Sequence, residues 1–415
     1  MTLEEANKQT GLAKFIQYSK LMGPAWFAVA LNTGGATVAN AGSLASRTGF
    51  TYMWALLPAT FTIWIACIMF TKVTLNTGMG PIAVMRTYLG EWAAWITGIS
   101  IFVVNSVFHA IQYALVGNIM NTLFGLPHQV GAIISFLFCA IVVLNPAGGD
   151  NSVKVVLKLM KWIVFILMIS FIFILFIVPI DWAGAARGFI PTMRGTPEEI
   201  VLLSGVVGAS IAINVPSLGA YIARQNKWNA SRQNLSVFEL TYTNVIYFAM
   251  QAVIIIAVAS VLYPQGIFVA GAAGMAETFR PFAGDFSVTL LSLGLLCAVL
   301  STMAMQVLVA GYVITDLMKW EADMTSKKFK ISEMTVTFFG LVGVLAGFNA
   351  FALAAYGSGF NMTFFPIVCG MMLIIGNKKS VMGENVLSRK MNIAIVLGII
   401  LALAGTANYW YNALS

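Results

Sequence analysis

Long apolar runs recur along the whole chain, and the short polar segments between them hold most of the charges. A helix needs about 20 mostly apolar residues to cross the hydrocarbon core of a bilayer. Every backbone amide in lipid must be bonded within its own segment, so these runs predict helices rather than open strands. We predict eleven spans, with the ninth and tenth divided only at Asn349: 22–46, 51–75, 92–122, 128–145, 152–179, 200–224, 236–263, 286–317, 331–348, 350–375 and 391–411.

The composition supports an integral membrane protein. Hydrophobic residues make up 59% of the 415 residues and charged residues only 9%, against about 25% charged residues in soluble domains. So few charges cannot cover a water-facing surface, so we expect residues 1–415 to form one transmembrane domain. The four cysteines lie singly in apolar runs, which is typical of packing rather than of a metal site or a disulfide. No cofactor is predicted.

The basic residues predict the orientation. With the N-terminus in the cytoplasm, 19 of the 23 Lys and Arg residues lie in inner segments and 4 in outer ones, as the positive-inside rule requires. Eleven spans then leave the C-terminus outside. No cleavable signal peptide is visible, and a bacterial inner membrane is expected. The net charge of +8 is spread over short loops, so it does not indicate a nucleic-acid partner.

Two of the predicted spans contain poor helix formers near their middle. The first reads Asn32-Thr33-Gly34-Gly35-Ala36-Thr37, and the sixth runs from Gly208 to Ser217 with Pro216 near its end. Glycine weakens a helix interior by about 1 kcal/mol relative to Ala, and proline removes an amide donor. Close helix packing or a plain kink would each explain one interruption. Two interruptions in corresponding spans indicate the binding site of a secondary transporter.

At this point the chain resembles the NRAMP family of transporters. The resemblance covers nearly the whole chain and rests on the order and spacing of several short motifs: Gly23-Pro24, Thr77-Gly78-Met79-Gly80, Leu123-Phe124-Gly125-Leu126-Pro127, Gly208-Ala209 and Lys378-Lys379-Ser380-Val381-Met382-Gly383. It implies an all-α LeuT-type fold with two inverted five-helix repeats, at about 22–179 and 200–375, followed by an extra helix at about 391–411. It also implies alternating access.

The chain departs from this family where the family binds metal. NRAMP metal transporters carry Asp-Pro-Gly-Asn in span one, where this chain has Gly34-Gly35-Ala36-Thr37. The family's Met-Pro-His triplet in span six falls on Ala212-Ile213-Asn214, and a second family histidine falls on Gly219. The Asp and Glu of the family's proton pathway in span three fall on His109 and Gln112.

The positions of the acidic residues also argue against a metal site, independently of the family resemblance. None of the 15 Asp and Glu residues falls in the middle of a predicted span, and removing water from a charge in a low-dielectric site costs several kcal/mol without compensation. Free amides at the half-helix after the first break suit a carboxylate. We therefore predict a transporter of a small organic solute, either a carboxylate or an amino-acid-like molecule. The alternative is a proton-coupled divalent-metal transporter of the Mn or Mg type with an atypical site.

The predicted substrate site combines the two breaks with a polar residue of span ten, without metal-ligating residues: Asn32, Thr33, Gly34, Gly35, Ala36, Thr37, Ser210, Ala212, Asn214, Ser217 and Asn361. His109 is the histidine inside a span, and its ordinary pKa near 6.5 suits proton coupling, with Gln112 one turn on. The other reading of His109 is a neutral core histidine. We expect a proton to be the coupling ion and Gln306 to form helix–helix hydrogen bonds.

Other classes of protein fit less well. The chain has no HExxH, GxSxG or nucleotide-binding loop, so an enzyme is not expected. No repeated pore loop suggests a channel, and no soluble signalling domain suggests a sensor. The expected partners are therefore a small-molecule substrate, a coupling ion and the lipid bilayer.

Overall fold

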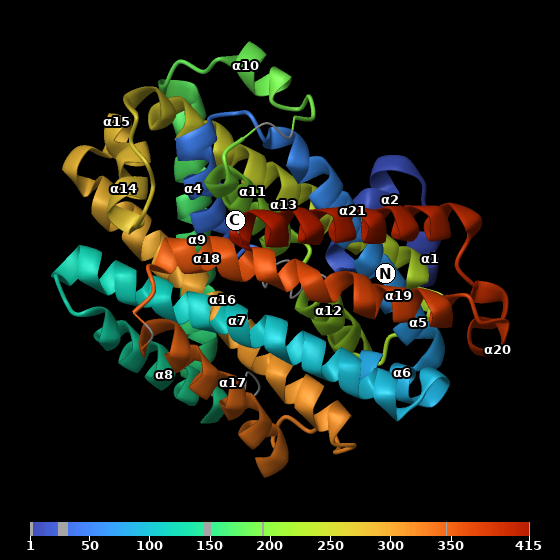
Figure 1. Ribbon diagram of the computed structural model, residues 1–415. Helices are drawn as coiled ribbons and strands as arrows, with labels where there is room; N and C mark the ends of the chain where they lie inside the picture. The colour runs from blue at the N-terminus through green and yellow to red at the C-terminus, as the bar shows by residue number, and fades with distance from the viewer. Residues whose placement is uncertain (1–2, 24–31, 145–150, 193–194, 346, 415) are drawn as a thin grey trace.

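The computed structural model describes residues 3–23, 32–144, 151–192, 195–345 and 347–414, and within these ranges every regular element is a helix (Figure 1). The helices that follow the predicted spans are α4 (Gly35–Thr48), α5 (Leu56–Thr77), α7 (Glu91–Phe124), α8 (His128–Leu144), α9 (Asn151–Ile177), α11 (Pro197–Ser210), α12 (Asn214–Gln225), α13 (Gln233–Val261), α16 (Ser287–Leu317), α17 (Lys327–Leu345), α18 (Ala350–Asn361), α19 (Phe365–Gly376) and α21 (Arg389–Leu414).

Shorter elements fill the ends and connections. The short α-helices are α1 (Leu3–Asn7), α2 (Gly11–Leu21), α6 (Pro81–Leu89), α10 (Trp182–Arg187), α14 (Ala272–Ala276), α15 (Arg280–Ala283) and α20 (Lys379–Met382). The 3₁₀ turns are η1 (Met53–Ala55), η2 (Ala230–Arg232), η3 (Tyr263–Gln265), η4 (Glu277–Phe279), η5 (Gly284–Phe286), η6 (Met362–Phe364) and η7 (Gly383–Asn385).

Each of the eleven predicted spans coincides with one or more of these helices, although residues 24–31 of the first span lie outside the described residues. Seven helical stretches of the described chain are long and apolar enough to cross a membrane. The division at Asn349 is confirmed, because its side chain accepts hydrogen bonds from the amides of Phe351 and Ala352 and so caps α18. The chain is a multi-pass membrane protein.

Span ten differs from the single helix that the sequence predicts. It is divided by η6 into α18 and α19, and Pro366 lies in the first turn of α19. Proline lacks the amide that a continuous helix would use and fits the first turn of a new one. The 3₁₀ turn within this continuous helical stretch therefore has a local cause, which the apolar run concealed.

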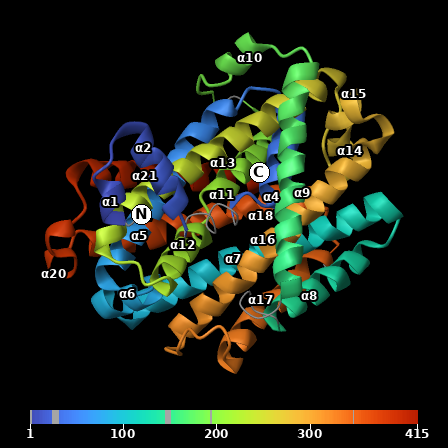
Figure 2. The same cartoon turned by 180° about the vertical axis from the view of Figure 1, so that it is seen from behind.

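Helix contacts place α7, α16 and α17 together with α8 on one side of the molecule, as both ribbon views show (Figures 1 and 2). The half-helix α11 packs against α18 at glycines: a Cβ on Gly208 would lie 1.9 Å from the Ser358 carbonyl oxygen. Asn40 of α4 joins the same contact by donating hydrogen bonds to the Gly205 carbonyl and to Ser358 Oγ, at 3.1 and 3.0 Å. These contacts hold the two broken spans side by side.

Candidate functional site

The two predicted helix breaks are present. In span one the chain turns out of helical geometry at Thr33 and Gly34, where Gly34 is extended, and α4 begins at Gly35. In span six α11 ends at Ser210 and α12 begins at Asn214. Pro216 lies in the first turn of α12, where no intrahelical partner for its amide is needed. The break therefore precedes the proline, and Pro216 starts the second half-helix.

One direct hydrogen bond joins the two breaks, and a second one closes the break in span one. The Asn32 side-chain amide donates to the Ser210 carbonyl at 3.4 Å, and Thr37 Oγ1 donates to the Asn32 carbonyl at 2.6 Å. Both Asn32 and Ser210 are buried. The first bond ties the end of α11 to the span-one break, and the second closes the turn that leads into α4.

A small cavity lies where the breaks meet. It leaves about 10 Å³ for the centre of a water-sized body, which is about the room that one water molecule or one bare ion needs. Its walls come from both breaks and from α7 and α16, and they contain no acidic residue: Asn32, Gly34, Ala36, Thr37, Phe108, Gln112, Ala209, Ala212, Asn214, Val215 and Gln306.

The orientation of the amides around this cavity follows from one backbone carbonyl. Asn105 Nδ2 donates to the Gln306 carbonyl at 2.8 Å, so Asn105 must present its Oδ1 to Asn214. Asn214 then donates its Nδ2 to that oxygen at 3.2 Å. The remaining atom of the Asn214 side chain, Oδ1, is left as an acceptor. Asn32 is fixed in the same way, because its Nδ2 faces the Ser210 carbonyl.

Two amide oxygens, of Asn32 and Asn214, are consequently buried without a hydrogen bond, and Gln112, whose side-chain amide makes no hydrogen bond in the described structure, adds a third. Asn32 Oδ1, Gln112 Oε1 and Asn214 Oδ1 have no partner within the described part of the chain, and all three residues line the cavity. A buried polar atom without a partner is destabilising by about 1–3 kcal/mol, so such atoms require an explanation. A cluster of three indicates a site that accepts a cation or a hydrogen-bond donor.

The comparisons with known proteins decide the family. The family described as "Natural resistance-associated macrophage protein-like" matches residues 25–411, nearly the whole chain. The chain belongs to the Nramp family. Curated relatives include proteins named "Divalent metal cation transporter MntH" from Bacillus subtilis, 22% identical over 318 residues with 74% of this chain and 73% of the relative covered, and from Granulibacter bethesdensis, 22% identical with 74% and 68% covered.

Solved structures agree on the fold. A manganese transporter of Eremococcus coleocola superposes with a TM-score of 0.75 at 12% identity, over 96% of this chain and 87% of that one. A Na⁺-coupled sialic acid symporter superposes with a TM-score of 0.60 at 13% identity, over 99% and 93% of the two chains. The LeuT-type fold predicted from the sequence is confirmed. The boundaries of the two repeats stay a prediction.

The predicted organic substrate is wrong. The curated relatives are named divalent metal cation transporters, and the Eremococcus coleocola structure is that of a manganese transporter. We expected the backbone amides at the start of α4 to bind the substrate. The buried side-chain atoms around the cavity that lack a partner are amide oxygens, which suit a cation. The small cavity also has no room for an organic acid in this conformation.

The structure sorts the predicted Nramp site residues into two groups. One group lines the cavity: Asn32, Gly34, Ala36, Thr37, Gln112, Ala212 and Asn214. The other lies outside its lining: Thr33, Gly35, Ser210, Ser217 and Asn361. Ser210 Oγ donates to the Val206 carbonyl and Ser217 Oγ to the Ile213 carbonyl, at 2.9 and 2.8 Å. Serine hydroxyls often donate to the backbone carbonyl four residues earlier. This bond explains why the two hydroxyls are not available to a substrate.

Asn361 and Gly35 are not among the residues that line the cavity. Asn361 ends α18 and is fully buried, and neither of its side-chain polar atoms has a partner among the described residues. Gly35 provides space instead of a ligand. A Cβ there would lie 3.0 Å from Gln112 Oε1 and 2.2 Å from a methyl group of Val299, so only glycine lets α4 approach Gln112 this closely.

His109 does not line the cavity, but it contacts Gln306, which does. Its Nδ1 is 2.8 Å from Gln306 Oε1, and its Nε2 is 3.7 Å from Cys139 Sγ. Gln306 both lines the cavity and bonds to Asn105 through its carbonyl. His109 is therefore connected to the site through Gln306 rather than through Gln112, the neighbour that the sequence suggested.

Sequence reasoning missed Phe108, Ala209 and Val215 as lining residues, and it missed the bridging role of Asn105. A signal for Asn105 existed, because it lies four residues before His109 and on the same helical face. Ala209 and Val215 lie within the predicted span-six interruption but were not predicted to face the substrate. No pattern marked Phe108, since an apolar residue in an apolar span carries no indication of what it faces. Within the described ranges, no group of three or more His, Cys, Asp or Glu side chains could hold a metal ion.

Proposed function

We propose that this Nramp-family protein is a secondary transporter of a divalent metal ion, and that the ion passes through the cavity at the two helix breaks. The observation that carries the proposal is the set of three buried amide oxygens, from Asn32, Gln112 and Asn214, that lack hydrogen bonds around a space of about 10 Å³. The names of the curated relatives support a metal cation as the cargo.

The ligand chemistry favours a hard cation. Carbonyl oxygens suit Mg²⁺, Ca²⁺ and Mn²⁺, whereas soft ions prefer thiolate or thioether ligands. The cavity lining has no methionine or cysteine. Mg²⁺ gives up its water reluctantly and usually keeps several water molecules, which this small cavity does not admit. We therefore propose Mn²⁺ as the preferred ion, held by the amide oxygens and by carbonyls freed at the breaks.

No carboxylate lines the cavity, so the negative end of α11 is the compensation that the described helices offer a cation, against the positive ends of α4 and α12. The carboxyl end of α11 reaches the cavity at Ala209 and is followed by the unwound residues 211–213. A helix carries about half a negative charge at this end, and half-helix ends of this kind coordinate cations in transporters with broken helices. This compensation is partial, so the ion is expected to bind more weakly than it would beside an acidic side chain.

We further propose that transport is coupled to protons through His109. An ionisable residue inside a membrane is a candidate for function by default, and this one contacts the cavity-lining Gln306 at 2.8 Å. Protonation of His109 would place a charge one residue away from the bound metal. For the whole protein we propose a bacterial inner membrane, with the N-terminus in the cytoplasm and the C-terminus outside, from the distribution of Lys and Arg.

Two substitutions at one position test the metal proposal. Purified protein in proteoliposomes is assayed for Mn²⁺ uptake and binding, with Gln112→Glu and Gln112→Leu compared with the unaltered chain. Added negative charge tightens cation sites, so Gln112→Glu is expected to raise Mn²⁺ affinity by about tenfold or more, equivalent to about 1.4 kcal/mol. Gln112→Leu is expected to lower the affinity. Weaker Mn²⁺ binding in Gln112→Glu, or no Mn²⁺ uptake by the unaltered protein, would contradict the proposal.

A further inference from the structure

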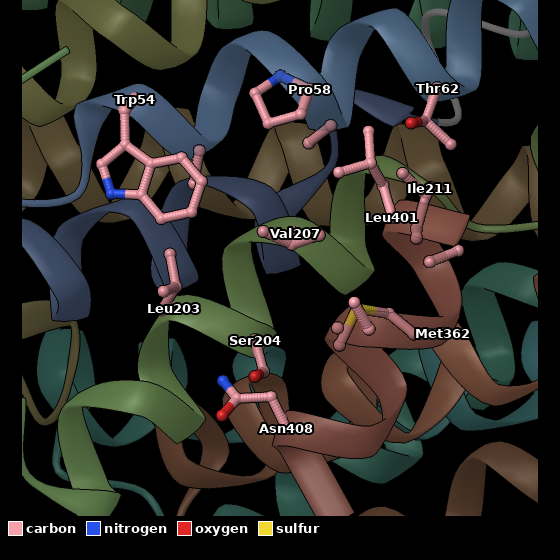
Figure 3. A pocket seen from close by; sticks show the side chains of 15 residues that line it. Trp54, Pro58, Thr62, Leu203, Ser204, Val207, Ile211, Met362, Leu401 and Asn408 are labelled. Carbon is pink, nitrogen blue, oxygen red and sulfur yellow. The ribbon is translucent and has the colours of Figure 1, made fainter. Parts of the chain in front are cut away.

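An apolar pocket beside the span-six break lies outside the ion site. It has a volume of about 190 Å³ and is enclosed by the start of α5, by α11, by η6 and by α21. Figure 3 shows Trp54, Pro58 and Thr62 along one wall, Leu203, Val207 and Ile211 along the second, and Leu401 and Asn408 on α21. We call this space the α5–α21 pocket.

The mouth of this pocket faces the bilayer. Leu401 is 43% exposed on α21, and Leu397, one turn before it on the same helix, is 50% exposed. In a membrane-spanning chain, exposed leucines in mid-span face hydrocarbon. The medium in contact with the pocket is therefore lipid rather than water.

The depth of the pocket corresponds to one leaflet. Its α5 wall runs from Trp54, just before the helix, to Thr62. The eight steps between these two residues span about 12 Å at 1.5 Å per residue, compared with about 15 Å for half of the hydrocarbon core. Trp54 lies at the loop end, where tryptophan side chains commonly meet the headgroup region, and Ile211 at the break marks the deep end.

The same stretch of α11 separates this pocket from the ion cavity. Val207 and Ile211 line the α5–α21 pocket, whereas Ala209 and Ala212 line the ion cavity. The last helical hydrogen bond before the break joins Ile211 N to the Val207 carbonyl at 3.0 Å. Anything that fills the pocket therefore packs directly against the turn that ends at the break.

We propose that the α5–α21 pocket is a binding site for the acyl chain of a membrane phospholipid, and that its occupant stabilises the last turn of α11. The chemical match is an apolar chain, about one leaflet long, entering from the hydrocarbon. An empty apolar space of this size forfeits the contacts of its lining atoms, and a flexible hydrocarbon chain from the surrounding bilayer restores them. The site is independent of the proposed cargo.

Photo-labelling tests this proposal directly. The full chain is reconstituted in nanodiscs with a phospholipid that carries a diazirine on its acyl chain, irradiated, and mapped by peptide mass spectrometry. Adducts are expected on Leu203 and Val207, which form the inner wall of the pocket, in addition to the exposed face of α21. Adducts confined to exposed positions such as Leu57 and Leu403 would overturn the proposal.

Two filling variants and a matched control make the result specific. A side chain at Gly405 enters the pocket, and its Cβ would meet only Met362 atoms, at 3.3 Å or more. Gly405→Phe, and Val207→Phe from the opposite wall, are expected to reduce labelling of Leu203 at least about fivefold, because close packing excludes the lipid chain. Ala407→Phe is the control on the exposed side of α21, and it should leave labelling unchanged.

The outcomes separate a lipid from a protein occupant. Loss of Leu203 labelling in both filling variants, with the control intact, supports the lipid site. Equal labelling in all variants overturns it. Cross-links between two copies of the chain across α21, in place of lipid adducts, would assign the pocket to a subunit interface and would also overturn the proposal.

Discussion

At the residue scale, the amides of the ion cavity differ in whether their oxygens are paired. Gln112 Oε1 has no hydrogen bond in the described structure, whereas Gln306 Oε1 contacts His109 Nδ1 at 2.8 Å. Both residues line the same cavity and both are nearly fully buried. A buried oxygen without a hydrogen bond destabilises the fold. Gln112 Oε1 is such an atom, and it lies beside the proposed path of the ion.

This difference predicts opposite effects on stability. Gln112→Leu removes an unpaired oxygen and is expected to leave the free energy of unfolding unchanged or to raise it by about 1–3 kcal/mol. Gln306→Leu, the matched control, removes a hydrogen-bond partner of His109 and is expected to lower it by a similar amount. Thermal unfolding in detergent, followed by intrinsic fluorescence, measures both. Equal loss of stability in the two variants would show that Gln112 is also paired.

Coupling to protons is tested at the same scale by the two histidines. His109→Gln retains a hydrogen-bonding amide beside Gln306 but cannot titrate, so Mn²⁺ uptake should lose its dependence on external pH. His128, which begins α8 and is exposed, provides the control: His128→Gln should keep the pH dependence. The measurement is Mn²⁺ uptake into proteoliposomes at a series of pH values. An unchanged pH profile in His109→Gln would show that His109 does not couple transport to protons.

At the scale of elements, glycine decides how closely the half-helices approach their neighbours. Gly208 of α11 faces the Ser358 carbonyl with no room for a Cβ, whereas Gly370 inside α19 has nothing within 4 Å of its Cβ position. The two residues are equivalent in a helix-propensity count, yet they differ completely in packing. The contact at Gly208 fixes α11 against α18 two residues before the break.

Substitution by alanine should therefore have opposite effects on the free energy of unfolding at these two positions. Gly208→Ala overpacks the α11–α18 contact and is expected to destabilise the protein by about 1–3 kcal/mol. Gly370→Ala gains helix propensity without a clash and is expected to stabilise it by up to about 1 kcal/mol. Apparent melting temperatures in one detergent should move in opposite directions. An unchanged melting temperature in Gly208→Ala would mean that the close approach of α11 to α18 is not maintained in the native protein.

At the scale of the whole molecule, contacts between α12, α16 and α6 close the end of the bundle where α12 and α16 end. Tyr221 OH donates to Asp316 Oδ2 at 2.8 Å, and the same carboxylate accepts from the Ala83 amide at 3.2 Å. Arg86 donates to the Asp316 and Leu317 carbonyls at 3.0 and 2.8 Å. The half-helix that carries Asn214 is therefore tied to two other elements below the ion cavity, and these ties must break for the site to open on this side.

Removing one of these ties should shift the conformational equilibrium. Tyr221→Phe deletes a hydrogen bond to a carboxylate worth about 1.5–3 kcal/mol, a change of about tenfold or more in the open population. Tyr312 stacks on Tyr221 with centroids 5.2 Å apart, but its hydroxyl contacts only Met324 Sδ, at 3.7 Å. Tyr312→Phe is therefore the control.

Accessibility of a buried position provides the readout. Ser217 of α12 is fully buried and the native cysteines are buried as well, so Ser217→Cys gives a low background for a water-soluble maleimide. Labelling should accelerate about tenfold or more in the Tyr221→Phe background and little in the Tyr312→Phe background. Equal labelling in the two backgrounds would mean that the Tyr221–Asp316 bond does not hold the closed state.

The sequence alone determined the spans, the two breaks in spans one and six, and the membership of a transporter family. These features depend on local properties: about 20 apolar residues for a span, and glycine or proline chemistry for a break. The division of span ten at Met362–Phe364 had a local cause in Pro366, but an uninterrupted apolar run concealed it.

Only the tertiary structure decided what the breaks present to a substrate. Whether an asparagine shows its oxygen or its nitrogen depends on a partner far along the chain: Gln306 orients Asn105, and Asn105 orients Asn214, 109 residues away. The hydroxyls of Ser210 and Ser217, which the sequence offered as ligands, are taken up by the carbonyls of their own segment. Hydrogen bonds between distant segments set the polarity of the site, and a one-dimensional pattern does not contain them.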